Sequence, residues 1–380
     1  MTETVPIKHV PNSEVDAAKE RTYVASQWQL MWWKFTNHKL AVFSAIVIIL
    51  LYLVAIFGDF VAPHDPLLRS GHPFAPPQLP RFRTEEGFQL RPFVYGIKSQ
   101  MDMKTFKRSY VPDTSKKYPI HFFVRGHKYK LFGFIETDLH LFGCGDGGAL
   151  YLMGTDQLGR DVFSRVVFGA RVSLSIGLIG VFLGLLLGIF FGGISGYFGG
   201  LTDMIVQRMI EILRSFPSIP LWMALAAALP PDWSPLFVYF GITVILSLIS
   251  WTGLARVVRG RFLSLRNEDF VLAARLGGAS EARIIRKHLL PSFASHIIAS
   301  LTLSIPSMIL AETSLSFLGV GLRPPVISWG VLLQDAQNIH AVAMAPWLMF
   351  PGLLVVIAVL AFNFVGDGLR DAADPYTTAT

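Results

Sequence analysis

Residues 268–291 read Glu-Asp-Phe-Val-Leu-Ala-Ala-Arg-Leu-Gly-Gly-Ala-Ser-Glu-Ala-Arg-Ile-Ile-Arg-Lys-His-Leu-Leu-Pro. This basic stretch lies between two apolar stretches, each long enough to cross a bilayer. A membrane protein that keeps such a polar loop between two spans presents it to a partner in solution. The loop therefore predicts a membrane-spanning fold with a docking segment at one membrane surface.

The local sequence predicts two short helices within this loop. Asn267 is placed to cap the first helix, whose opening turn carries two acidic residues that favour the positive end of the helix dipole. Gly277 and Gly278 supply a turn. Ser280 is placed to cap the second helix, and Pro291 is expected to end it. We expect a helix parallel to the membrane that fits a groove on a cytoplasmic protein; the alternative is a surface loop with ordinary amphipathicity.

The composition excludes an ordinary soluble domain. The 380 residues are 52% hydrophobic and only 16% charged, and the mean hydropathy is positive. A spanning helix needs about 20 apolar residues. Uncharged runs of that order occur at residues 40–58, 172–202, 233–255 and 346–366. Two less regular runs, at 204–229 and 292–318, contain charged residues. The sequence predicts six spanning helices.

The distribution of basic residues predicts the orientation of these helices. Residues 255–292 carry eight Lys or Arg and the first 39 residues carry five, whereas the loop at 230–235 has none and the loop at 319–345 has only Arg323. Because basic residues close to spans stay in the cytoplasm, both termini are expected there. The first apolar run is expected to be an uncleaved span rather than a signal peptide.

The tail before the first span ends in an aromatic cluster. Trp28, Trp32 and Trp33 stand beside Lys34 and Lys39. This pattern indicates a short helix at the inner membrane surface, or an aromatic belt that anchors the first span.

Roughly 100 residues between the first two spans are expected on the outer side. Residues 63–80 contain six prolines and predict an extended connector. Aromatic and β-branched runs at 120–124 and 129–135 predict a β-hairpin whose turn is 125–128. A small β-containing subdomain is the expected structure. Because the chain has one cysteine, Cys144, no intramolecular disulfide can stabilise it.

The same insertion is strongly basic. Residues 81–130 hold twelve Lys or Arg and four Asp or Glu, although the whole chain has a net charge of only +7. Such a positive field attracts an acidic protein partner, anionic headgroups or carboxylate-bearing substrates. An ordinary solvated surface is an equal alternative. Nucleic acid is a poor candidate on the outside of a membrane.

The loop at 268–291 resembles the cytoplasmic coupling segment of ABC-transporter permeases, whose pattern is Glu-Ala-Ala, three residues, Gly, nine residues, Ile, one residue, Leu-Pro. Leu272 stands where the family has Glu, and His288 where it has Ile, without a change of spacing. The matching positions are Ala273, Ala274, Gly278, Leu290 and Pro291. The resemblance implies contact with an ATPase through Leu272, Ala273, Ala274, Gly277, Gly278, His288, Leu290 and Pro291.

Further segments resemble the dipeptide and oligopeptide branch of these permeases, in particular its C-type subunit. They are residues 154–165, 169–174, 196–200, 216–217, 312–319 and 370–375. The first of them reads Gly154, Thr155, Asp156, Gln157, Leu158, Gly159, Arg160 and Asp161 at its start, and we call residues 154–161 the GTD motif. In the family this motif leads into the second span. The resemblance covers 154–375 and the first span, and it implies nothing specific for 81–150.

Charged residues within spans are costly and are candidates for function. Arg208, Glu211 and Arg214 recur at three-residue intervals, so Glu211 can neutralise both arginines. A structural clamp between spans is favoured for them over substrate contact. Glu312 lies far along the fifth span, near the outer interface. Packing, gating and binding are the alternative roles for it there. His296, in the same span, has no partner at metal-ligand spacing.

The expected organisation follows from these features. It comprises a cytoplasmic tail at 1–39, a first spanning helix at 40–62, a connector and basic insertion at 63–153, a permease domain at 154–375 with its coupling loop at 256–291, and a cytoplasmic tail at 376–380. The fold class is an all-α polytopic membrane protein with a small β-containing periplasmic insertion.

The resemblance implies a permease subunit of an ATP-driven importer in the bacterial inner membrane. It implies a second permease subunit, two ATPase subunits and a periplasmic solute-binding protein. The chain has no Gly-x-x-x-x-Gly-Lys-Ser/Thr loop, so no cofactor is expected on it, and ATP and Mg are expected on the partners. Peptides are the expected substrates, with oligosaccharides of the galactoside type or nickel as alternatives. The rival classes are a secondary transporter or channel that works alone and a membrane scaffold.

Overall fold

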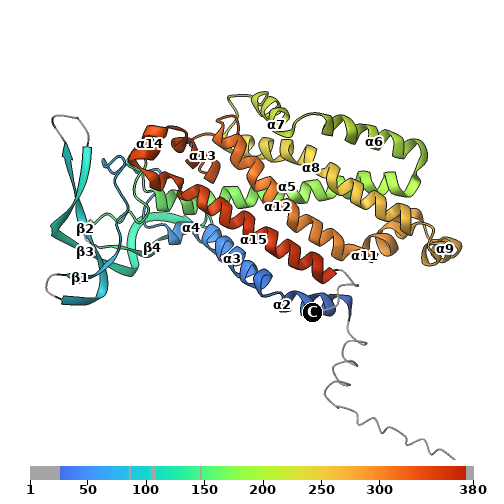
Figure 1. Ribbon diagram of the computed structural model, residues 1–380, viewed down its shortest axis with the longest axis horizontal. Coiled ribbons are helices and arrows are strands. Elements are labelled where there is room, and N and C mark those ends of the chain that lie inside the picture. The colour runs from blue at the N-terminus through green and yellow to red at the C-terminus, as the bar shows by residue number, and fades with distance from the viewer. Residues whose placement is uncertain (1–25, 85–86, 102, 104–107, 146–147, 374–380) are drawn as a thin grey trace, which may run out of the picture.

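The computed structural model describes residues 26–84, 87–101, 103, 108–145 and 148–373. A bundle of long helices carries a β-sheet at one end, the sheet end, and the predicted coupling loop at the opposite end, the coupling end (Figure 1). Residues 1–25 of the tail expected at 1–39, and the whole tail expected at 376–380, lie outside the described residues. The two segments that the sequence assigns to opposite membrane surfaces are therefore at opposite ends of the bundle.

Five helices are long and apolar enough to span a membrane. They are α3 (Lys39–Ile56), α5 (Val162–Phe198), α8 (Pro235–Leu265), α12 (Ala294–Phe317) and α15 (Phe350–Ala373). Helix α5 packs along α8, and α15 packs between α3 and α12. The uncharged runs and the run at 292–318 are thus confirmed as helices.

A stripe of small residues brings α5 and α8 together. Glycines recur every four residues on the face of α5 that meets α8, at Gly180, Gly184, Gly188, Gly192 and Gly196. A Cβ atom on Gly192 would lie 2.4 Å from the carbonyl oxygen of Ala255, closer than atoms can approach. Without a hydrophobic drive in lipid, such backbone contact is a main source of helix association.

The sixth predicted span, at 204–229, is not a continuous helix. Two shorter helices, α6 (Gly200–Ser215) and α7 (Ser218–Ala227), replace it. The break falls at Pro217, which lacks a backbone N–H and disfavours helical backbone in the residue before it. Neither helix reaches the length needed to span a membrane alone. Six continuous spans are therefore not found among the described residues.

Short elements complete the helical part. They are α2 (Gln27–Asn37), α4 (Gly58–Val61), α9 (Asp269–Leu276), α10 (Glu281–Ile284), η1 (Ile285–Leu289), α11 (Leu290–Ser292), α13 (Trp329–Leu333), η2 (Gln334–Gln337), α14 (Ile339–Met344) and η3 (Pro346–Met349). The predicted tryptophan-rich helix is α2, which Ser26 caps in a reciprocal capping box with Gln29. Trp28, Trp32 and Trp33 are exposed on it, as an interfacial helix requires.

The insertion forms a four-stranded antiparallel sheet in the order β1-β2-β3-β4. The strands are β1 (Arg81–Thr84), β2 (Gly87–Met101), β3 (Arg108–Leu131) and β4 (Ile135–Cys144). Val94, Ile120 and Leu150 form its small core. His140 contacts the carbonyl oxygen of Ala62 at 2.8 Å and thereby joins the sheet to the end of α4. The prediction of a β-containing insertion is confirmed.

The position of the predicted hairpin turn is wrong. Strand β3 runs through 125–128, where its register with β4 shifts, and the chain reverses at Phe132, Gly133 and Phe134. Gly133 has φ +82°, a conformation that suits glycine. The basic run at 125–128 contains residues typical of turns, but the strand continues through it. The actual turn lies among apolar residues, which give no turn signal in the sequence.

Candidate functional site

Helix α9 forms the core of the coupling segment and projects from the coupling end of the bundle (Figure 1). Its N-cap is Glu268, which makes no side-chain capping bond, so the prediction that Asn267 caps the helix is wrong. Asp269 lies in the first turn and Arg275 in the last, and both charges favour the helix dipole. The helix therefore begins one residue later than predicted. The charges of its first and last turns stabilise it, and no side-chain cap does.

The predicted glycine turn is present at the end of α9. Gly278 has φ +74°, and its N–H donates to the carbonyl oxygen of Arg275 at 3.0 Å. The N–H of Ala279 donates to the carbonyl oxygen of Ala274 at 3.0 Å. These two bonds form a Schellman motif, for which glycine is favoured at the left-handed position. Gly277 precedes it with φ −73° and needs no special freedom.

The second helix does not end at Pro291, contrary to expectation. Ser280 is at its N-cap without a side-chain bond, and the helix continues through a π-helical turn at Ile285–Leu289 into α11. A π-turn widens the helix just before Pro291, where an α-helix would bring the proline ring against a carbonyl. His288 lies in this π-turn, at the position of the second departure from the family pattern.

One side of the coupling segment is anchored in the bundle. Val271, Ile284 and Leu289 are fully buried and pack with Phe262 of α8 and Phe293 in a single cluster. The Arg275 guanidinium donates to the hydroxyl of Tyr197, at the end of α5, at 3.3 Å. The coupling segment is therefore packed directly against the ends of α5 and α8 and the start of α12.

The other side of the segment is exposed and apolar. Leu276 is 90% exposed, and Phe270, Leu272 and Ala273 are exposed beside it. The predicted contact residues are divided between the two sides: Ala274, His288 and Leu290 are half-buried, while Leu272, Ala273, Gly277, Gly278 and Pro291 are exposed. A group of exposed apolar side chains on a charged loop, here Phe270, Leu272 and Leu276, is typical of a protein contact.

An ion pair that the sequence did not reveal ties α6 to α8. Asp203 accepts bonds from the Nε and a terminal nitrogen of Arg259 at 2.5 and 2.6 Å, and from the hydroxyl of Ser195 on α5 at 2.5 Å. The partners are 56 positions apart in the sequence, which excludes any local spacing signal. Among the described residues, this bidentate pair holds the three helices together near the coupling end.

We expect Arg259→Lys to lower the free energy of unfolding by about 1 kcal/mol, because lysine cannot form the two parallel bonds of the guanidinium fork. Thermal unfolding of the protein in lipid nanodiscs measures the change. The control is Arg256→Lys, which alters an exposed arginine on the same helix and should leave the transition unchanged. Equal transitions for the two variants would show that the bidentate geometry does not matter.

The three charged residues predicted to interact on α6, which we call the α6 triad, lie on an exposed surface. Arg208 donates to Glu211 at 2.7 Å, with exposed side-chain fractions of 73% and 52%. Arg214 is exposed and makes no salt bridge among the described residues. The predicted neutralisation is seen for Arg208 alone. Among the described residues, the ion pair that joins α6 to another helix is that of Asp203 with Arg259, which we call the clamp.

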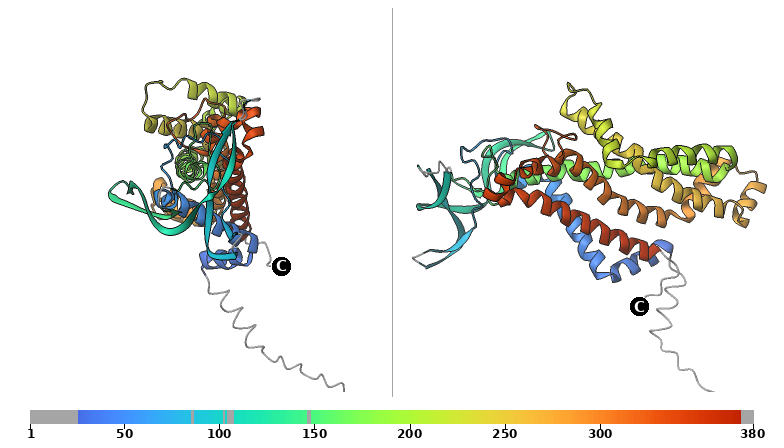
Figure 2. Two further views of the ribbon diagram at one scale, coloured as in Figure 1. Left: turned by 90° about the vertical axis from the view of Figure 1, so that its left-hand side faces the viewer. Right: turned by 45° about the horizontal axis from the view of Figure 1, so that its top comes forward.

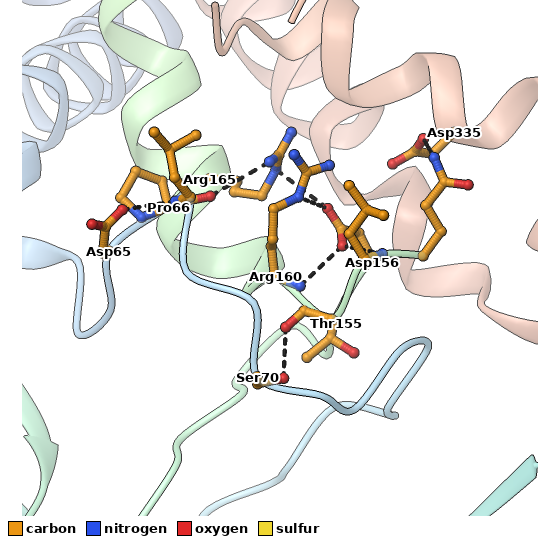
Figure 3. Close-up of polar contacts among 12 residues, drawn as sticks. Asp65, Pro66, Ser70, Thr155, Asp156, Arg160, Arg165 and Asp335 are labelled. Atoms are coloured by element: carbon orange, nitrogen blue, oxygen red, sulfur yellow. Dashed lines mark hydrogen bonds and ion pairs between the residues drawn. The ribbon is translucent and has the colours of Figure 1, made fainter. Parts of the chain in front are cut away.

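The GTD motif forms a hydrogen-bonded structure at the sheet end, which we call the latch (Figure 3). The Thr155 hydroxyl accepts the N–H of Ala75 at 2.8 Å and donates to the carbonyl oxygen of His72 at 2.5 Å. The indole of Trp347, just before α15, donates to the carbonyl oxygen of Thr155 at 2.9 Å. A Cβ on Gly154 would lie 2.6 Å from the Ala75 oxygen. The motif thus binds the connector to the start of α15.

Asp156 closes this latch through backbone and side-chain bonds. It accepts the N–H groups of Leu158 and Arg160 at 2.8 and 3.0 Å, and the Arg160 guanidinium at 2.7 Å. Gly159, with φ +74°, makes the tight turn, and its carbonyl oxygen accepts the hydroxyl of Ser70 at 2.6 Å. All six predicted residues of the motif are brought together, in a rigid structure rather than an open ligand site.

Asp161 caps α5 from within the latch. Its carboxylate accepts the N–H and the hydroxyl of Ser164 at 2.9 and 2.6 Å. Burial raises the pKa of Asp161 to about 6, although the bonds from Ser164 oppose the shift. Arg165, one turn into α5, lies 3.6 Å from Asp156 and does not reach Asp161 as an ion-pair partner. Asp161 is therefore a buried carboxyl whose pKa lies above the usual range of aspartate.

This raised pKa predicts a pH dependence of stability. The folded state holds the proton of Asp161 more tightly than the unfolded state does, so stability from this group is full below pH 4 and is lost as the pH rises through about 6. A shift of this size corresponds to about 3 kcal/mol. Asp161→Asn keeps an acceptor for Ser164 but cannot titrate, so unfolding followed from pH 4.5 to 7.5 should lose this slope. An unchanged slope would contradict the assignment.

Glu312, near the sheet end of α12, is fully buried. Three serines from different parts of the chain surround its carboxylate. Its carboxylate accepts the hydroxyls of Ser328 at 2.7 Å, Ser316 at 2.8 Å and Ser173 at 3.2 Å. We call Ser173, Ser316 and Ser328 the serine cage. No basic side chain forms a salt bridge with Glu312 among the described residues.

Each serine of the cage also accepts a backbone N–H. Ser328 accepts from Val331 at 3.2 Å, Ser316 from Leu322 at 3.0 Å, and Ser173 from Trp329 at 3.1 Å. Each serine oxygen already accepts one of these N–H groups. Its own hydroxyl proton is therefore donated to Glu312. The carboxylate thereby fixes the loop after α12, and helix α13, against α5. Packing is thus the role that the geometry supports for Glu312.

No group of histidine, cysteine, aspartate or glutamate residues suitable for a metal ion occurs in the described part of the chain. Two candidate functional surfaces lie at opposite ends of the bundle. One is the exposed side of the coupling segment, and the other is the latched sheet end. A bundle of long apolar helices, with a short exposed helix anchored at one end, defines a multi-pass membrane protein.

Comparison with known proteins identifies the family. Residues 166–378 match the binding-protein-dependent transport system inner membrane component, and residues 26–77 match the N-terminal transmembrane domain of oligopeptide transport permease C. The chain belongs to this family of ABC-transporter permeases, as the resemblance of its motifs predicted. The rival classes of a solitary transporter and a scaffold are not favoured.

Characterised relatives share about two fifths of the aligned residues. The dipeptide transport system permease protein DppC of Bacillus subtilis is 42% identical over 224 residues, which cover 58% of this chain and 68% of that protein. The oligopeptide transport system permease protein OppC of Haemophilus influenzae is 41% identical, over 59% of this chain and 70% of that protein. OppC of Escherichia coli K12 is 38% identical, over 64% and 79%.

Among solved structures, inward facing conformations of the MetNI methionine ABC transporter align with 55% of this chain and 97% of that chain. The TM-score is 0.45 and the identity 21%.

Proposed function

We propose that the chain forms half of the pore of an ATP-driven importer of di- or oligopeptides. The observation that carries the proposal is helix α9, with one side packed into the bundle ends and the other side apolar and exposed. The relatives named for dipeptide and oligopeptide transport support the substrate class.

In the proposed mechanism, two ATPase subunits bind ATP and Mg in the cytoplasm, and this chain binds neither. The exposed side of α9 fills a groove on one ATPase. When ATP binding draws the ATPases together, α9 is displaced and carries α5, α8 and α12 with it through the cluster around Val271. The pore then switches from inward to outward access by rigid-body motion.

A second permease subunit would complete the pore, most simply a related but different chain. Helices α6 and α7 offer the surface for it, because large apolar side chains are exposed along both of them. These are Met204, Ile205, Met209, Ile212, Phe216 and Ile219. The ion pair of Arg208 with Glu211 lies on the same helix, where an aqueous pore between the two chains would solvate it.

The orientation follows from this arrangement. With α9 on the ATPases, the coupling end faces the cytoplasm, both termini lie on that side, and the sheet end faces a periplasmic solute-binding protein. The basic surface of the sheet is suited to an acidic partner. The chain would then reside in the bacterial inner membrane.

Competition of uptake tests the substrate class. Cells that depend on this transporter take up a labelled tripeptide, and unlabelled peptides, a galactoside-type oligosaccharide and nickel are added separately. The proposal predicts that only peptides compete. Competition by the oligosaccharide or by nickel, without competition by peptides, would transfer the transporter to that substrate class.

A further inference from the structure

The tip of the β3–β4 hairpin is apolar and has no core to cover it. Phe132 and Phe134 on either side of Gly133 are 49% and 75% exposed, and Ile135 beside them is exposed as well. Farther along β3, Phe122 and Phe123 are also exposed. A soluble subdomain normally keeps such a cluster of large side chains out of water. The tip therefore has a partner of apolar chemistry.

The depth of the tip follows from its contact with α3. The ring of Phe132 lies 5.7 Å from the ring of Phe57, which directly follows the last residue of this helix. The 18 residues of α3 extend roughly 27 Å, about the thickness of the hydrocarbon core. Phe57 is therefore at the edge of the hydrocarbon layer. A side chain packed against it lies at the same depth.

A groove of about 530 Å³ lies between the tip and helices α3 and α5. Its lining includes Tyr52 and Ala55 of α3, Leu174 and Leu178 of α5, and Phe132 and Gly133 of the tip. The hairpin reaches out sideways from the bundle beside α3 (Figure 2). The apolar surface of the spans is thus continuous with that of the tip.

Basic residues flank the apolar tip. Arg125, Lys128 and Lys130 are exposed on the same strand, and Lys130 lines the groove together with Arg171. Lys130 is 3.5 Å from Glu136, and Arg171 is 2.8 Å from Asp59, so both cations are partly neutralised. Arg125 and Lys128 form no salt bridge among the described residues. Apolar side chains framed by cations are the pattern that binds an anionic lipid interface.

We propose that the β3–β4 hairpin inserts its tip into the membrane leaflet at the sheet end, with Phe132 and Phe134 among the acyl chains and Arg125 and Lys128 at the lipid phosphates. The contact of His140 with the carbonyl oxygen of Ala62 supports the hairpin from the bundle side. The sheet is then held at two points, by the bundle and by the bilayer. This inference does not depend on the transported substrate.

Depth-dependent fluorescence quenching tests the proposal on the full chain, assembled with its partners in nanodiscs that contain phosphatidylglycerol. An environment-sensitive fluorophore is attached at Phe134→Cys in a Cys144→Ser background. Leu90→Cys is the matched control, because Leu90 is an apolar residue of the same sheet, 91% exposed and on strand β2. A second label at Phe123→Cys provides an independent position should Phe134→Cys not assemble.

The proposal predicts that lipids with a shallow nitroxide quench the label at position 134 at least threefold more than the label at 90, with a blue-shifted emission, whereas aqueous iodide quenches only the label at 90. Position 123 should resemble 134. Equal quenching of 134 and 90 by iodide would overturn the proposal. Protection of position 134 that arises only when the solute-binding protein is added would also overturn it, and would assign the tip to that protein.

Discussion

Leu276→Asp is expected to release the ATPase subunits from the purified complex. Leu276 is 90% exposed on α9, so its replacement removes no contact within the chain. In the proposed complex this side chain is buried in the ATPase groove, where a leucine contributes about 1.5–3 kcal/mol. A carboxylate there adds the cost of its own desolvation. The affinity should therefore fall at least about 100-fold.

Co-purification of the ATPase with a tagged permease measures this effect. The control is Lys287→Gln, which also changes one charge on an exposed surface at the coupling end but lies outside α9. It should retain the ATPase in full. Loss of the ATPase from both variants would indicate a general charge effect, and retention in Leu276→Asp would exclude α9 as the contact.

Glu312→Ala is expected to be the most destabilising substitution at the sheet end. It removes the acceptor of three buried hydroxyls, and each unsatisfied buried group costs about 1–3 kcal/mol. The free energy of unfolding should fall by about 3 kcal/mol or more, and uptake should fall with the amount of folded protein. Glu312→Gln keeps one acceptor oxygen and should cost about half as much.

The matched control is Glu211→Gln, which changes the other carboxylate of the predicted intramembrane set. Glu211 is 52% exposed, and an exposed pair contributes at most about 1 kcal/mol. Thermal unfolding in nanodiscs and the yield of assembled complex measure all three variants. If Glu312→Ala unfolded at the same temperature as Glu211→Gln, the serine cage would not be a structural element.

The coupling segment could be predicted from the sequence because its signals are local. The two acidic residues, the glycine pair and the spacing to Pro291 lie within one short stretch. The errors there concern details that tertiary contact decides. Glu268 rather than Asn267 precedes the helix, and a π-turn lets the helix pass Pro291. Burial of Ile284 and Leu289 against the bundle favours that continuation.

The clamp and the serine cage could not be predicted because their members are distant in sequence. Asp203 and Arg259 come from different helices, and Ser173 and Ser328 are brought to Glu312 only by the packing of α5 against α13. A serine in an apolar helix gives no signal of its partner. The α6 triad, by contrast, had the local spacing of an ion pair but lies on an exposed surface.

The prediction of the spans was likewise limited by contacts between residues that are distant in the sequence. Hydropathy located α3, α5, α8 and α15 from long uncharged runs, and α12 from a run that Glu312 interrupts. The run at 204–229 has comparable length, but Pro217 divides it, and the position of α7 relative to α6 depends on tertiary packing.

The ATPase activity of the complex tests the central claim most directly. The complex is purified through a tag on this chain, placed in lipid with its solute-binding protein, and given ATP and Mg with or without a peptide pool. The account predicts that ATPase subunits co-purify, that peptides stimulate hydrolysis severalfold, and that Leu276→Asp abolishes the stimulation. A chain that purifies without any ATPase, yet still transports in lipid, would contradict it.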